Sequence, residues 1–130
     1  MGKLIESVRK IFLLDLITFQ IEMVAHKIKK QNLIEKVKEL LKSIYDPEIS
    51  VNIYDLGLIY DIQINKLAHL KVTMTLTSPN CPIADNFVKE VKQKIQTLVL
   101  DKTIDVILTF DPIWSIDMLS EEASFQLELE

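Results

Sequence analysis

The residue of this chain that is best suited to chemistry is Cys81, the single cysteine among 130 residues. It lies in the run 78–82, Ser-Pro-Asn-Cys-Pro. Proline is favoured at the first position of a helix, so Pro82 predicts that Cys81 lies at or near a helix N-cap. The helix dipole favours an anion there, and a thiolate can bind a metal or attack an electrophile. The alternative is a small buried hydrophobic residue, as free cysteine often is.

Three carboxylates lie in the turns before the first expected strand. Asp46 and Glu48 flank a proline, and Asp55 lies two residues before Gly57. Carboxylates in this segment could orient a metal or a polar partner. They could equally be turn residues, because Asp before Pro and Gly with unusual backbone angles are both typical of turns.

Hydroxyl and imidazole side chains are the remaining candidates. Thr75 and Thr77 are expected on the polar face of a strand just before Cys81, either as ordinary strand residues or as hydroxyl donors to a group that the cysteine holds. His69 falls in a predicted hairpin turn and His26 near the N-terminus, and neither has a neighbour at metal-ligand spacing. A Cys81–His69 pair is a minor alternative. Because no general base is evident, the sequence favours a protein that is not an enzyme.

The elements that position these residues follow from hydrophobic periodicity. Residues 33–44 have one apolar helical face, and Asp46-Pro47 ends that helix. A second amphipathic helix is predicted from Ile83 to Leu98. Three segments alternate apolar and polar residues and are therefore predicted strands: 58–64, 70–77 and 104–111. The first two form a hairpin, and the intervening helix predicts that the last two are parallel. The expected fold class is α/β, a two-layer α+β domain of order α-β-β-α-β with a three-stranded mixed sheet packed by helices.

Residues 1–30 form an N-terminal helical extension to the domain predicted at 31–130. They are apolar and only loosely follow a helical period, which predicts a helix over about 3–28. Such a helix needs a surface to pack on, either the domain or a second copy of the chain. Met23 would also serve as a start, so we expect the extension to be dispensable for folding.

Composition excludes several classes of function. The formal net charge is −4 and no basic stripe with interleaved aromatic residues occurs, so nucleic acid is not an expected partner. Asp15 interrupts the apolar N-terminal stretch, which argues against a membrane span and against a signal peptide. A single cysteine cannot form an internal disulfide, which fits a reducing compartment, and we expect the protein to be cytoplasmic.

Three motifs together resemble a known family, the SufT/PaaD-like metal–sulfur cluster biosynthesis family. They are 46–61 (DPEI followed by VNIYDLGLIYD from residue 51), 74–82 (MTLTSPNCP) and 111–123 (DPIWS followed by DMLSEEA from residue 117). The resemblance covers roughly residues 33–127. Asn80 replaces a glycine common in the family, and Ile113 replaces a proline. Residues 1–30 lie outside the resemblance.

The resemblance implies the α/β fold of iron–sulfur cluster assembly domains and a role in maturing iron–sulfur proteins. It implies that Cys81 is the metal or cluster contact. The acids and threonines of the family's motifs carry over onto a supporting set of five residues: Asp46, Glu48, Asp55, Thr75 and Thr77.

A cluster usually has four protein ligands, so one Cys81 per chain cannot hold it alone. We therefore expect a carrier or adaptor that binds iron or an iron–sulfur cluster transiently, with no tightly bound cofactor. The expected partners are iron–sulfur assembly proteins, client apo-proteins and a second copy in a homodimer. Two alternatives stay open: a metal-free protein-interaction module, and a PaaD-type accessory protein of an oxygenase complex.

Overall fold

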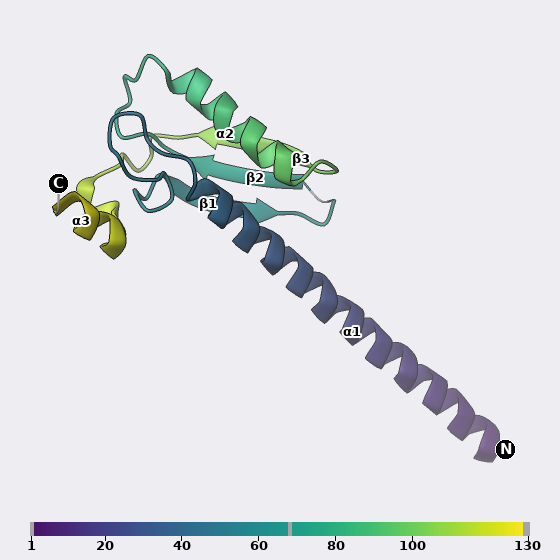
Figure 1. Cartoon of the computed structure of the whole chain (residues 1–130). Helices are drawn as coiled ribbons and strands as arrows, with labels where there is room; N and C mark the ends of the chain where they lie inside the picture. The colour runs from purple at the N-terminus through teal and green to yellow at the C-terminus, as the bar shows by residue number, and fades with distance from the viewer. Residues whose placement is uncertain (1, 68, 129–130) are drawn as a thin grey trace. The chain divides into compact units, whose positions relative to one another are not determined.

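The alternating segments of the chain form strands and the helix-period segments form helices in the computed structural model, which describes residues 2–67 and 69–128. The elements in chain order are α1 (Gly2–Leu41), β1 (Ile59–Ile64), β2 (His69–Met74), α2 (Ala84–Leu98), β3 (Thr103–Leu108), the 3-10 turn η1 (Ile116–Met118) and α3 (Glu121–Glu128) (Figure 1). The chain divides into two units, residues 1–33 and 34–130. Helix α1 is continuous through this boundary, whereas the sequence predicts two separate helical segments.

The second unit is built on a three-stranded sheet of order β1-β2-β3. β1 pairs antiparallel with β2, and β2 pairs parallel with β3, with Val72 opposite Ile62 on one side and Val106 on the other. The Asn65 side-chain oxygen accepts the backbone N–H groups of Leu67 and His69, each at 2.9 Å, and so fixes the hairpin turn. The predicted mixed sheet and its α-β-β-α-β order are confirmed.

Helix α2 packs on β3, and Figure 1 shows the two side by side. Its buried residues are Phe87, Val91 and Ile95. Within the same unit, the last turns of α1 bury Val37 and Leu41. Ile83 and Leu98, the first and last residues of the predicted amphipathic helix, are exposed, because Ile83 is the N-cap of α2 and Leu98 is its last residue.

The loop between α1 and β1 is as well packed as a regular element. Four of its apolar residues, Val51, Ile53, Leu56 and Leu58, are fully buried. Backbone hydrogen bonds close it, including Ile53 N–H to the Ile44 carbonyl at 2.8 Å. Gly57 has φ +77°, and a Cβ there would overlap the carbonyl oxygen of Met118. The acidic candidates of the sequence therefore lie on a well-packed loop.

The C-terminal segment fastens this loop. The Trp114 indole N–H donates to the Leu56 carbonyl at 2.6 Å, and the Tyr60 hydroxyl donates to the Pro112 carbonyl at 2.7 Å. The sequence predicts no helix after Pro112, but α3 forms there. The sequence signal for the start of this helix is Ser120 followed by two glutamates. In the structure the Ser120 hydroxyl accepts the Ala123 N–H at 3.0 Å, which is the hydrogen bond of an N-cap residue.

Strands β2 and β3 end three residues before the predicted ends, at Met74 and Leu108. After the end of β2 a different part of the structure accepts the next hydrogen bond: the Thr75 N–H donates to the Leu58 carbonyl at 2.8 Å. Periodicity along the strand cannot show this change, because the alternation continues in the sequence.

The first unit consists of α1 up to Leu33. Large apolar side chains along it are exposed, from Leu4 to Ile28. Among residues 2–67 and 69–128, no helix combines the length and the apolar character that crossing a bilayer requires.

Candidate functional site

A small pocket in the second unit brings together side chains from two distant parts of the sequence. Asp46 and Glu48 come from the loop after α1, and Thr77 and Cys81 come from the segment between β2 and α2. The rest of its lining is apolar: Pro47, Leu76, Ile83 and Phe87. Its volume is about 10 Å³, room for about one water molecule. Four of the six residues that the family resemblance singles out thus share one pocket.

Asp46 shapes this pocket through the backbone. Its side chain is buried, and Oδ1 accepts the N–H groups of Glu48 and Ile49, each at 2.9 Å. This is an Asx turn, in which a carboxylate replaces a backbone carbonyl as the acceptor. Asp46 therefore positions Glu48, whose side chain is exposed at the rim.

Cys81 is half-buried in the turn before α2. The prediction that Pro82 occupies the first helical position is wrong: α2 begins at Ala84, with Ile83 as its N-cap. The reason is a preceding turn, in which the Ala84 N–H donates to the Cys81 carbonyl at 3.2 Å. Cys81 therefore lies two residues before the N-cap. The property that suits its thiol to chemistry is accessibility in the pocket rather than the helix dipole.

The two threonines have different environments. Thr77 lines the pocket and is half-buried. Thr75 is fully buried, and its hydroxyl has no hydrogen-bond partner among the described residues. The expectation that both occupy the polar face of one strand is wrong, because the strand ends at Met74 and the backbone turns toward Leu58.

Asp55 does not line the pocket. One carboxylate oxygen accepts the Asn52 side-chain amide at 2.7 Å, and its carbonyl accepts the Ser120 N–H at 2.8 Å. Asp55 is also one of three carboxylates near Lys42. The pKa of Lys42 is raised, mainly by Glu39 and to a smaller extent by Asp55 and Glu122. These contacts assign Asp55 to the structure of the loop.

The histidines take no part in the pocket. His69 begins β2, at the far end of this strand from Cys81, and its Nε2 lies 2.8 Å from Asp105 Oδ2 on β3. The Cys81–His69 pair is therefore excluded. Over the described ranges 2–67 and 69–128, no group of three or more His, Cys, Asp or Glu side chains is arranged to hold a metal ion.

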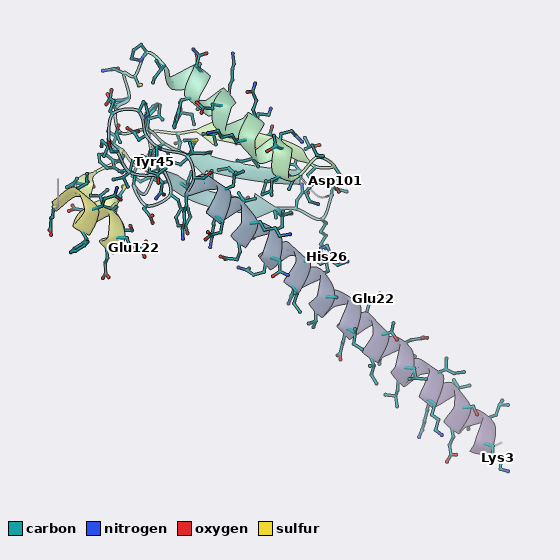
Figure 2. All side chains as sticks on the ribbon, viewed as in Figure 1. Lys3, Glu22, His26, Tyr45, Asp101 and Glu122 are labelled. Carbon is teal, nitrogen blue, oxygen red and sulfur yellow. The ribbon has the colours of Figure 1, made fainter. Side chains whose placement is uncertain are left out.

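The sequence gives little sign of the apolar wall of the pocket. Three of its residues, Pro47, Ile83 and Phe87, also line a neighbouring groove of about 220 Å³ that extends to Tyr45 and Lys94. Figure 2 shows Tyr45 on the segment that follows α1. The signal that the sequence offers is a pair of large side chains near prolines, Ile83 directly after Pro82 and Tyr45 two residues before Pro47, and both remain exposed.

Comparison with known proteins identifies relatives for most of the chain. The model of a family described as iron–sulfur cluster assembly protein matches residues 34–106. A curated Fe-S protein maturation auxiliary factor from Porphyromonas gingivalis is 46% identical over 93 residues, which are 72% of this chain and 89% of the relative. Another from Bacillus subtilis is 35% identical over 96 residues, 74% of this chain and 94% of the relative.

Solved structures agree with this match. The crystal structure of a domain of unknown function from Bacillus anthracis has 31% sequence identity and a TM-score of 0.73, covering 80% of this chain and 99% of that one. A conserved hypothetical protein from Thermotoga maritima has 35% identity and a TM-score of 0.61, covering 72% and 91%. The motifs, the fold and these relatives agree, and the chain belongs to the SufT-like iron–sulfur cluster assembly protein family.

Proposed function

We propose that this protein is an iron–sulfur maturation factor that receives iron or a cluster at Cys81 and passes it to a client protein. The observation that carries the proposal is the shared pocket, in which an accessible thiol lies with the carboxylates of Asp46 and Glu48. Thiolates bind the iron of such clusters, and carboxylates bind iron ions. The curated relatives bear the name of maturation auxiliary factors, which supports the same role.

The pocket favours a carrier over a protein that keeps its cluster. With a volume of about 10 Å³ it has no room for a cluster, which would therefore bind at its mouth. One thiolate supplies one of the four ligands that a cluster usually has. The remaining ligands come from a partner, a small thiol or a second copy of the chain, and a site completed in this way is easily dismantled.

Transfer then needs only ligand exchange. A client thiolate forms a new bond to iron while the bond from iron to Cys81 breaks. No electrons are gained or lost, and the proton released by the client thiol balances the proton that the freed Cys81 takes up. In this proposal Glu48, which is exposed on the rim, holds an iron ion during the exchange, and the hydrogen bond from the Glu48 N–H to Asp46 keeps its backbone in position.

Anaerobic reconstitution with iron and sulfide tests the proposal. We expect the wild-type chain to gain visible absorbance and bound iron, and Cys81→Ala to gain neither. Ser78→Ala is the matched control, since it removes one polar atom from the same turn and should bind as the wild type does. Equal iron and sulfide in wild type and Cys81→Ala would contradict the proposal, as would full rescue of client enzyme activity by Cys81→Ser in a deletion strain.

A second candidate is a metal-free module that docks assembly proteins onto clients. The neighbouring groove favours it, because Tyr45 and Ile83 expose large apolar surface there. In that case Tyr45→Ala would abolish client maturation, while Cys81→Ala would leave maturation unchanged. The same pair of variants therefore separates the two candidates.

A further inference from the structure

Helix α1 carries a regular seam of aliphatic residues in the first unit. Leu14, Ile17, Ile21, Val24 and Ile28 are separated alternately by three and four residues. This is the spacing of the two core positions of a coiled-coil heptad, which keeps one row of side chains facing a partner helix. Continuing the same spacing beyond the row places Lys10 and Glu35 at core positions. Charged residues at these positions end the apolar row, so the seam extends from Leu14 to Ile28.

The helix surface also has the holes that such a seam needs. A hollow on α1 is lined by Ile17, Gln20, Ile21, Val24, Ala25 and Ile28. A coiled-coil hole is formed by four neighbouring residues of one helix, at i, i+3, i+4 and i+7. Residues 17, 20, 21 and 24 form one such set, and residues 21, 24, 25 and 28 form the next. The same segment therefore offers both the knobs and the holes.

These side chains lack burial within their own unit. Leu14 is 61% exposed, Ile17 51% and Ile21 63%. A single helix cannot bury a row of its own side chains, and a contiguous exposed apolar surface of this kind marks an interaction site. The seam therefore requires an occupant.

The residues around the seam fit a copy of the same helix. Contact between identical subunits requires a self-complementary surface, and a patch of one charge would repel its copy. Between Leu14 and Ile28 the positions that flank the seam are occupied by Thr18, Gln20, Ala25 and Lys27. Of these only Lys27 is charged, so two such seams meet with little repulsion along their length. A lipid surface fits this segment less well, because interfacial helices have cationic polar faces, whereas residues 14–28 carry two acids, Asp15 and Glu22, and one base, Lys27.

We propose that residues 14–28 of α1 associate with the same residues of another copy of this chain as a coiled coil. Burial of the aliphatic seam drives the association. It involves no residue of the Cys81 pocket and does not depend on the proposed function, so either proposal can fail alone. β-Branched residues at both core positions, Ile21 and Ile28 at one and Ile17 and Val24 at the other, favour three or four copies over two.

The test is the mass of the full chain in solution, measured by light scattering over a range of concentrations. A single chain has a mass of 15.0 kDa. We expect the wild type to show a multiple of this mass, and the double variant Ile17→Gln/Ile21→Gln to show 15.0 kDa. The matched control Asp15→Gln/Glu22→Gln places the same two glutamines outside the seam on the same helix and should keep the wild-type mass.

Further measurements make each outcome decisive. Fluorescence of Trp114, the single tryptophan, reports whether the second unit stays folded in the seam variant, so a loss of mass with an unchanged spectrum supports the proposal. A wild-type mass of 15.0 kDa at all concentrations would overturn it. So would equal losses in both double variants. Flotation of a monomeric wild-type chain with vesicles of phosphatidylcholine and phosphatidylserine would assign the seam to lipid and also overturn it.

Discussion

Asp46 has a structural role and contributes a charge to the pocket, and these two contributions can be separated. Its Oδ1 atom accepts two backbone N–H groups in the turn that presents Glu48. An asparagine side-chain oxygen can accept the same hydrogen bonds but carries no charge. The structural role of Asp46 therefore needs an oxygen at this point, whereas any role in holding iron needs the charge.

For Asp46→Ala, we expect a loss of about 1–3 kcal/mol in the free energy of unfolding, because two N–H groups lose their acceptor in a partly buried turn. Asp46→Asn should keep most of the stability. Urea denaturation followed by Trp114 fluorescence measures both. If Asn destabilises the chain as much as Ala does, the turn depends on the charge and the present assignment of Asp46 is incorrect.

Gly57 is the second residue on which the loop depends. Its φ of +77° is unfavourable for other residues, and a Cβ would overlap Met118. We expect Gly57→Ala to reduce the free energy of unfolding by about 1–3 kcal/mol or more. Gly2→Ala is the control, since nothing lies within 4 Å of a Cβ at that helical position and stability should not fall. An unchanged urea midpoint for Gly57→Ala would show that the loop relaxes freely.

For single residues, the sequence indicates which side chains are candidates for the site, but it does not indicate which of them lie close together. The family resemblance groups Cys81, Asp46 and Glu48, and the structure brings them to one pocket. The resemblance also includes Asp55 and Thr75, which lie outside this pocket. Their positions are decided by tertiary hydrogen bonds, to Ser120 and Leu58, between residues far apart in the chain, and local patterns contain no record of such bonds.

The elements whose hydrophobic pattern is strongly periodic are predicted correctly from the sequence. Helix α3, which depends on its N-cap, is not predicted. The alternation in β1, β2 and β3 predicts the mixed sheet, because one face of each strand must reach the core. Helix α3 has only eight residues and little apolar periodicity. Its existence rests on the Ser120 cap and on the contacts that hold the preceding segment against the loop, of which the Trp114 hydrogen bond to Leu56 is one.

Helix α3 should therefore be sensitive to its cap. We expect Ser120→Ala to destabilise this helix by about 1 kcal/mol, because the Ala123 N–H loses the acceptor that the hydroxyl provides. Hydrogen exchange of the α3 amides should then accelerate by about fivefold, while exchange in β2 stays unchanged. Ser124→Ala, inside the same helix, should not accelerate exchange, since alanine is the better helix former. Equal acceleration in both variants would contradict capping by Ser120.

On the scale of the whole molecule, the two proposed activities belong to different units. The pocket with Cys81 lies entirely within residues 34–128, and the family match also begins at residue 34. The proposed coiled coil lies entirely within residues 14–28. Self-association would supply thiolates from several chains, but the geometry of each pocket does not require it. The unit proposed to bind iron should therefore be separable from the unit proposed to associate.

A chain that begins at Met23 tests this separation directly. It retains the second unit and loses Leu14, Ile17 and Ile21, so we expect it to fold and to remain a monomer. Association stabilises the folded state by mass action, so the thermal midpoint of the full chain should rise with protein concentration, whereas that of the shortened chain should not. Calorimetry at several concentrations measures both. Failure of the shortened chain to fold would show that residues 1–22 are needed by the second unit. A concentration-dependent midpoint in the shortened chain would place the association surface outside the seam.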